Sequence, residues 1–187
     1  SGKQIVKDIS YEATGNSAKF TLLINWASAT DVPLLFETRT IKITTDKNAI
    51  IYDFALEFDA RYGRVRFGDT KEGGLLSVRV PTSMDVPQGQ IINSNGKKCT
   101  RKSEERQVWG KRAEWCCYAG KVDGKSAGIA IIDHPNNPIY PTYWHVRSYG
   151  LMTANPFGKS HFVFPLFKGT WILEDKKVAI WRYRLVI

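Results

Sequence analysis

The feature that most limits the fold of this chain is an alternation of apolar and polar residues with a period of two. In residues 49–59, one set of alternate positions is apolar throughout, whereas the other set includes Asp53 and Glu57. Successive side chains of a β-strand point to opposite faces, so this pattern predicts a strand with one buried face. The apolar set is Ile50, Tyr52, Phe54, Leu56 and Phe58.

Similar runs, separated by turn residues, recur along the chain, and no convincing amphipathic helix interrupts them. Asp123-Gly124 between two apolar runs predicts a β-hairpin. About ten strands in 187 residues predict one all-β domain over residues 1–187, a large antiparallel β-sandwich without major helices. The further expected strands are 19–26, 34–44, 65–67, 75–80, 113–121, 126–132, 161–167, 170–173 and 178–187.

Charge and hydropathy exclude some partners. No apolar run approaches the roughly 20 residues that span a bilayer, so no membrane span is expected. The net charge is +9, with a denser basic region between Lys97 and Arg112 that Glu104 and Glu105 interrupt. Because no nucleic-acid motif accompanies it, we interpret the region as a solvated basic loop and expect no nucleic-acid partner.

The three cysteines, Cys99, Cys116 and Cys117, form no disulfide framework, because their number is odd and adjacent cysteines rarely pair. One of the adjacent pair is expected to face the core. No Cys-x-x-Cys spacing suggests structural zinc. His134 and His145 lie eleven residues apart without local metal-binding spacing, so neither a metal site nor a cofactor is predicted.

Residues 133–158 are the leading candidate for a functional site. They contain two of the three histidines and four of the eight prolines, and they lie between two expected strands. Long loops rich in polar residues often carry function, although proline and aromatic residues could also serve only to stiffen the connection.

A second candidate is Phe67-Gly68-Asp69-Thr70-Lys71-Glu72-Gly73-Gly74. Glycines allow sharp bends and close approach to a ligand. A glutamate near a histidine can act as a general base or bind a sugar hydroxyl. The structural alternative is a charged hairpin turn in which Lys71 neutralises its neighbours.

Several motifs resemble a bacterial family labelled "methane oxygenase PmoA", widely treated as a domain of unknown function. They are DHPNNP, PTYWHVRSYGL and NPFG within residues 133–158, the segment 67–74, and WGKRA at 109–113. The resemblance implies that this chain is the C-terminal part of a longer family member and favours a periplasmic or secreted location. The ending WRYRLVI is similar to the last strand of galactose-mutarotase-like sandwiches, which implies that architecture.

The cluster of histidine, glutamate, arginine and aromatic residues in these segments, together with the expected architecture, suggests which residues act. The expected catalytic residues are His134 or His145 as the acid and Glu72 as the base. Aromatic faces stack on sugar rings, and polar side chains bind hydroxyl groups. The residues expected to bind the ligand are Asp69, Lys71, Arg112, Asp133, Trp144, Arg147 and Asn155.

Three functions remain open from the sequence. The first is a carbohydrate-binding or carbohydrate-active protein, with a small-molecule ligand in a His/Glu/Arg/aromatic cleft. The second is a non-catalytic binding or interaction module, so whether the chain is an enzyme stays open. The third, a metal-dependent oxygenase, is disfavoured because the chain has few metal ligands. The sequence leaves the oligomeric state undetermined.

Overall fold

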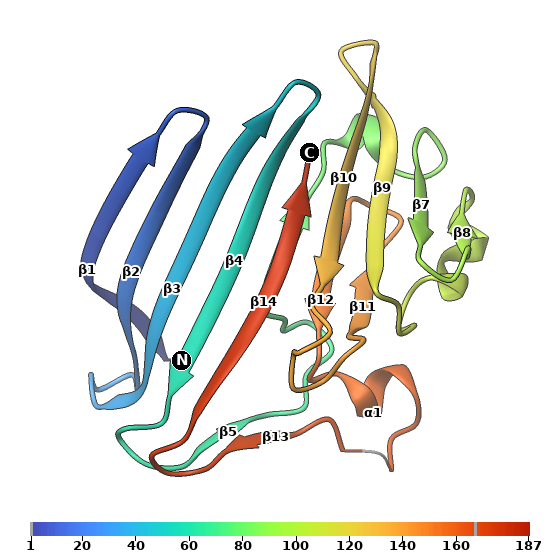
Figure 1. Ribbon diagram of the computed structural model, residues 1–187. Coiled ribbons are helices and arrows are strands. Elements are labelled where there is room, and N and C mark those ends of the chain that lie inside the picture. The colour runs from blue at the N-terminus through green and yellow to red at the C-terminus, as the bar shows by residue number, and fades with distance from the viewer. Residues whose placement is uncertain (1, 167) are drawn as a thin grey trace.

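The computed structural model describes residues 2–166 and 168–187, and its main element is a nine-stranded antiparallel sheet (Figure 1). In spatial order the strands are β1 (Lys3–Thr14), β2 (Ser17–Ala27), β3 (Pro33–Asp46), β4 (Ala49–Asp59), β14 (Val178–Val186), β10 (Lys125–Asp133), β9 (Trp115–Val122), β7 (Gln90–Asn93) and β8 (Lys98–Cys99).

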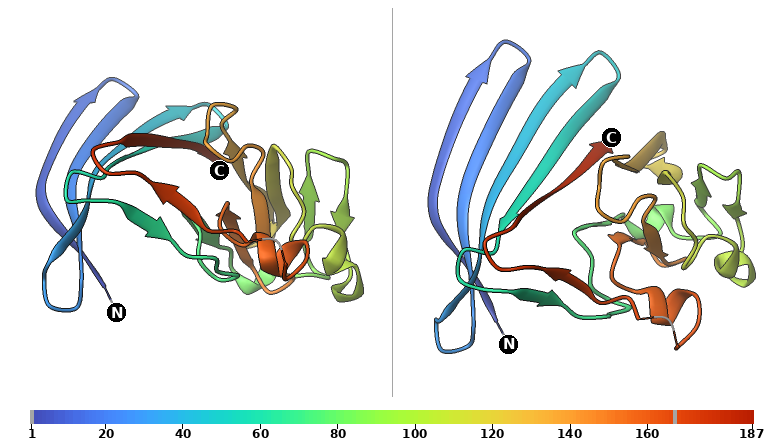
Figure 2. Two further views of the ribbon diagram at one scale, coloured as in Figure 1. Left: turned by 90° about the horizontal axis from the view of Figure 1, so that it is seen from below. Right: turned by 60° about the horizontal axis from the view of Figure 1, so that its bottom comes forward.

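Two smaller elements lie beside this sheet. A three-stranded sheet has the order β11 (Tyr143–Val146), β12 (Leu151–Asn155) and β6 (Leu76–Arg79). A two-stranded ribbon pairs β13 (Trp171–Leu173) with β5 (Val65–Phe67) and runs beyond one end of the large sheet (Figure 2). The helices of the described residues are short: α1 (Lys159–Phe162), η1 (Thr82–Met84) and η2 (Lys102–Gln107). None of them is long and apolar enough to cross a membrane.

The core lies between the large sheet and the three-stranded sheet. Cross-strand pairs such as Trp181 with Leu56 place large apolar side chains on one face of the large sheet. Trp144 and Met152, both fully buried, come from the small sheet and belong to the same cluster. The alternation along β4 contributes to this packing, because Leu56 and Phe58 are buried and Tyr52 and Phe54 on the same face are partly buried.

The all-β fold with a large antiparallel sheet and no major helices is confirmed. The hairpin at Asp123-Gly124 joins β9 to β10, and both turn residues have positive φ. Cys116 is fully buried, as expected for one member of the adjacent pair.

Three local predictions were wrong. Residues 133–158 are not one long loop, because they contain β11 and β12 as an antiparallel pair. All four residues of β11 are buried, so the alternation that reveals a strand with one solvent face is missing there. Strand β1 was not predicted at all, and nearly all of its residues are exposed, which also removes the apolar signal.

The third error concerns residues 161–167, expected as a strand. Residues 159–162 form α1, and Val163, Phe164 and Leu166 are exposed apolar residues beyond it. Phe167 lies outside the described residues. Phe162 packs against other aromatic rings, and this tertiary contact has no period along the sequence.

Candidate functional site

A polar row crosses the face of the three-stranded sheet that points away from the core. The register pairs His145 of β11 with Thr153 of β12, and Thr153 with Ser77 of β6. Cross-strand partners share a face, and adjacent residues of each strand point to the opposite face. Thr153 donates a hydrogen bond to the Ser77 hydroxyl at 2.9 Å. His145 and Thr153 are buried, whereas Ser77 is exposed.

The imidazole of His145 is oriented by Trp109. The indole Nε1–H donates to His145 Nδ1 at 3.1 Å, so Nδ1 must be unprotonated. The proton of the neutral ring therefore lies on Nε2. That atom is 3.3 Å from Oε2 of Glu72, within the distance of an ion pair, and it makes no hydrogen bond to the described residues. Trp109 thus selects the tautomer that presents an N–H toward the carboxylate.

Glu72 reaches His145 from the glycine-containing loop 68–74, which Asn155 holds in place. Asn155 is fully buried, and its Nδ2 donates to the carbonyls of Thr70 and Lys71 at 2.8 and 3.0 Å. Its Oδ1 accepts from the backbone N–H of Phe157 at 2.9 Å. These bonds tie the loop to the end of β12. Asn155 therefore supports the site through the backbone of the loop.

The residues around Glu72 and His145 determine the protonation states of these two side chains. The hydrogen bond from Lys71, 3.0 Å from Glu72 Oε1, lowers the pKa of Glu72, and the nearby His145 adds to this effect. Burial lowers the pKa of His145, and Arg147 and Lys71 lower it further, although Glu72 acts in the opposite direction. At neutral pH the site therefore combines a charged acceptor with a neutral donor.

A ring from α1 covers the histidine. Phe162 lies over His145 with the rings 27° apart, and it makes edge contacts with Trp109. It fits closely because Gly158 and Gly110 have no side chains: an added Cβ would lie 2.3 Å and 3.1 Å from atoms of its ring. Phe162 lies against His145, and burial lowers the pKa of this histidine.

Exposed polar and aromatic groups lie next to this pair. The guanidinium carbons of Arg147 and Arg79 lie 5.3 and 5.5 Å from the ring centre of Tyr149, a residue that is 45% exposed. Arg147 also forms an ion pair with Glu105 at 3.0 Å. Together with Glu72 and Ser77, these groups offer hydrogen-bond donors, acceptors and one accessible aromatic face.

Asp69 holds the segment that carries α1. Its Oδ2 accepts from the backbone N–H of Gly169 at 2.5 Å, and its Oδ1 lies 3.9 Å from Nε2 of His161. The carboxylate thereby contacts the chain on both sides of the exposed residues 163–166. Asp69 is thus in place to fix the position of Phe162.

Asp133 has a structural environment. The side chain is 4% exposed and accepts from the N–H groups of His134 and Thr142 and from the amide of Asn137. Burial raises its pKa to about 6, and the three hydrogen bonds act in the opposite direction. The Asn137 amide also bonds to both backbone groups of Arg182, so it extends the ladder of β14 beyond the end of β10.

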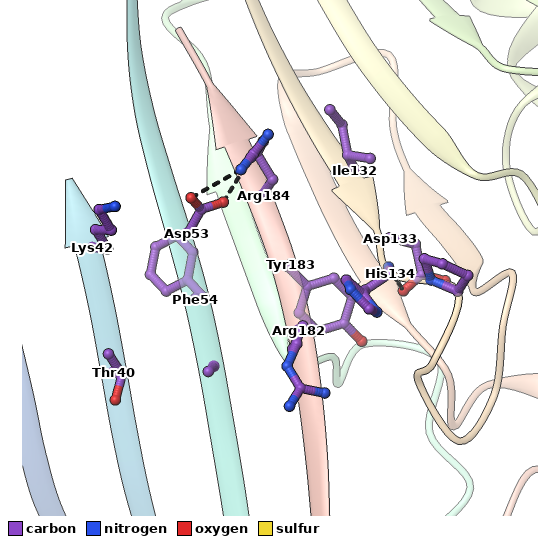
Figure 3. A pocket seen from close by; sticks show the side chains of 12 residues that line it. Thr40, Lys42, Asp53, Phe54, Ile132, Asp133, His134, Arg182, Tyr183 and Arg184 are labelled. Carbon is purple, nitrogen blue, oxygen red and sulfur yellow. Dashed lines mark hydrogen bonds and ion pairs between the residues drawn. The ribbon is translucent and has the colours of Figure 1, made fainter. Parts of the chain in front are cut away.

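His134 lies in a different place from His145. It lines a hollow of about 520 Å³ over β3, β4 and β14, where Asp53 forms an ion pair with Arg184 (Figure 3). The imidazole Nδ1 accepts from the backbone N–H of Asn136 at 3.1 Å. Either histidine was expected to serve as the acid beside Glu72, and the structure brings His145, not His134, to that carboxylate.

Of the other residues expected to bind the ligand, some lie at the His145–Glu72 site and some lie elsewhere. Lys71 and Arg147 lie close enough to His145 to affect its pKa, so they belong to the site. Trp144 is fully buried and donates to the Ala113 carbonyl at 2.9 Å, so it fills the core. Arg112 donates to the carbonyls of Pro141 and Tyr140 and lines other hollows.

Sequence reasoning assigned no role to Phe162, Thr153 and Ser77, and it considered Trp109 as an aromatic platform for a sugar or a core residue, not as a partner of His145. Trp109 precedes Gly110, which has a φ of 68°, and this turn directs the indole toward β11. A tryptophan followed by a turn glycine is therefore a local signal that could have indicated a fixed orientation for the Trp109 side chain. No local pattern indicates Phe162. Across residues 2–166 and 168–187, no three or more His, Cys, Asp or Glu residues gather as a metal site would require.

Comparisons with known proteins identify a family, and they also find similar solved structures. A family model described as "Family of unknown function (DUF6807)" matches residues 1–187. No curated protein matches the chain. Among solved structures, a galactose mutarotase related enzyme from Lactobacillus acidophilus is 8% identical, with a TM-score of 0.37, over 95% of this chain and 70% of that chain. At that TM-score the two structures differ too much for residues to be equated.

Proposed function

From the premise that this chain belongs to DUF6807, a family of unknown function, we propose that it binds a carbohydrate at the His145–Glu72 site. The observation that carries the proposal is the hydrogen bond from Trp109, which fixes an Nε2–H of a buried, neutral histidine 3.3 Å from an exposed carboxylate. A fixed donor beside a charged acceptor suits the hydroxyl groups of a sugar.

The neighbouring side chains support the same ligand class. Tyr149 provides an exposed ring for stacking, and Ser77, Lys71 and Arg147 provide further polar contacts. Sugars combine apolar ring faces with many hydroxyl groups, so a site for them needs both kinds of surface.

In a reaction, Glu72 would be the proton acceptor. Its lowered pKa keeps it ionised at neutral pH, and its side chain is 65% exposed. His145 is poorly suited to act as an acid, because Trp109 already donates to Nδ1 and burial disfavours the charged ring. His145 then orients the ligand or Glu72 by donating from Nε2.

The second candidate, a non-catalytic binding module, is favoured by one specific observation. His134, expected as a further acid, lines the hollow shown in Figure 3 and not the Glu72 site. With His145 kept neutral and His134 elsewhere, neither histidine serves as an acid beside Glu72. This arrangement supports binding more strongly than turnover.

The test is a thermal-shift screen with mono- and oligosaccharides on the wild type, on Glu72→Gln and on Glu57→Gln as a control from the large sheet. A ligand at a hundred times its Kd adds about 2.7 kcal/mol of stability. A sugar whose shift is lost only in Glu72→Gln supports the site. Wild-type shifts that Glu72→Gln retains would refute it. Product formation from that sugar would then decide between an enzyme and a binding module.

A further inference from the structure

We propose that the surface around Arg112 binds the acidic groups of an anionic oligosaccharide, so that the carbohydrate of the proposed function carries carboxylates or sulfates. The proposal therefore rests on the proposed function and specifies its ligand class. It concerns two adjoining hollows with cationic linings, which the sequence had suggested to be no more than a solvated basic loop.

The two hollows share Arg112. One, of about 490 Å³, is lined by Asn95, Lys97, Arg106, Gln107, Lys111 and Arg112. The other, of about 220 Å³, includes Lys159 and Lys168 with Arg112 and Tyr143. Six cationic side chains thus line two hollows that meet at Arg112, and no described residue that lines either hollow bears a carboxylate. Such a concentration of one charge attracts anions.

The fold separates this charge from the acidic residues that interrupt it in the sequence. Glu104 accepts from the N–H and hydroxyl of Thr100, both at 2.9 Å, and pairs with Arg101 at 2.7 Å. The Thr100 N–H contributes most to holding the pKa of Glu104 near 2. Glu105 binds the backbone N–H of Ser148 and pairs with Arg147. Both carboxylates of η2 are therefore engaged with other groups, while Arg106 lines the hollow.

The guanidinium group of Arg112 is held in a fixed position by hydrogen bonds to the backbone. Its Nε donates to the Pro141 carbonyl at 2.7 Å and its Nη2 to the Tyr140 carbonyl at 2.9 Å. Its guanidinium carbon lies 5.4 Å from the ring centre of Tyr143. No hydrogen bond of Nη1 occurs within the described part of the chain. A guanidinium fixed at two donors loses little entropy when the remaining donors bind an anion.

The surface adjoins the His145 site. Tyr143, which lines the smaller hollow, contacts Phe162 with ring centres 5.7 Å apart, and Phe162 covers His145. The backbone N–H of Gly110 also donates to the carbonyl of Trp144, which brings the chain from Trp109 to Arg112 along β11. A chain of several sugar units could therefore contact Glu72 with one unit and the cationic surface with others.

The experiment measures binding of a galacturonic acid hexamer, its methyl-esterified and therefore neutral form, a sulfated hexasaccharide and a short DNA duplex by calorimetry. The proteins are the wild type, Arg106→Gln/Lys111→Gln, and the control Lys121→Gln/Lys125→Gln from the β9–β10 hairpin. Both variants lose two positive charges at exposed positions, so non-specific charge effects are matched.

We expect an acidic hexamer to bind, the ester to bind at least about tenfold more weakly, and affinity to fall with salt. Arg106→Gln/Lys111→Gln should weaken binding by about tenfold or more, whereas the control should retain it. The carboxylated and sulfated arms identify which acid is preferred. Equal loss in both variants, equal affinity for the ester, or a DNA duplex that binds as tightly as the sugar would overturn the proposal.

The two proposals fail in different ways. A neutral sugar that binds through Glu72, with no preference for an acidic form, would overturn the anionic ligand and leave the carbohydrate site standing. An acidic hexamer that binds equally to wild type and Glu72→Gln would support the cationic surface and remove Glu72 from recognition. If no sugar of either kind binds, both proposals fall.

Discussion

Trp109 and His145 are joined by a hydrogen bond across 36 residues of sequence, from the indole Nε1–H to the imidazole Nδ1. Trp144, next to His145 in the chain, donates instead to a backbone carbonyl in the core. The two tryptophans therefore have different roles: one fixes a tautomer, and the other fixes the packing of β11.

Replacing Trp109 with phenylalanine should release the tautomer of His145. The Nδ1 acceptor loses its partner, so the ring gains freedom to carry its proton on either nitrogen. We expect ¹⁵N NMR to show the Nε2–H form in the wild type and a mixture in Trp109→Phe. The stability loss in urea should be about 1–3 kcal/mol, the cost of an unsatisfied buried group. An unchanged tautomer in Trp109→Phe would contradict the assignment, and Trp115→Phe is the control.

Alanine at Gly158 should raise the pKa of His145. The added Cβ would lie 2.3 Å from Cε2 of Phe162, so the ring must move away from the histidine. Since burial is the largest cause of the lowered pKa, exposure should bring it toward its ordinary value of 6.5. NMR titration of the His145 C2–H measures this.

Gly128→Ala is the matched control, because its Cβ would lie 3.6 Å from the Tyr118 carbonyl, an ordinary contact. A folded Gly158→Ala protein in which His145 titrates as in the wild type would show that Phe162 does not cause the shift.

Most strands could be predicted because their alternation is a direct consequence of having one buried face. Strand β4 was found to the residue, since its apolar side chains face the core and Asp53 and Glu57 lie on the opposite face. Strands β1 and β11 were missed for opposite reasons. Both faces of β1 are largely exposed and both faces of β11 are buried, so neither shows a contrast between its faces.

The candidate site was predictable only in part. His145 and Glu72 belong to the two polar segments that the sequence marked, and the structure brings these residues into contact. His134 stands in the same segment as His145 but lies elsewhere, because β10 ends at Asp133 and the chain turns before β11 begins. The turn depends on Asp133 and Asn137, whose partners include a strand 45 residues away. Long-range pairing of this kind has no local signature.

Asp133 should make stability decrease as pH rises through about 6. An unfolded aspartate titrates near 3.8, whereas burial raises the folded value to about 6. Between these values the folded state binds more protons, so its stabilisation is present at low pH and is lost as the pH increases. The free energy of unfolding of the wild type, measured relative to that of Asp133→Asn, should therefore decrease from about pH 4 to about pH 7. Asp123→Asn, at the exposed hairpin turn, corrects for the loss of one carboxylate, and a constant difference would refute the prediction.

Asn137 and Asn136 offer a matched pair for testing the connection between β10 and β14. The Asn137 side chain makes three hydrogen bonds, to Asp133 and to both backbone groups of Arg182, and it is 5% exposed. At about 1 kcal/mol for each bond, Asn137→Ala should lower the free energy of unfolding by about 3 kcal/mol. Asn136 is exposed, so Asn136→Ala should change it by less than about 0.5 kcal/mol. Urea denaturation of both variants measures the two values. Equal and small losses would mean that water replaces the Asn137 amide at the edge of β14, and that the ladder ends where β10 ends.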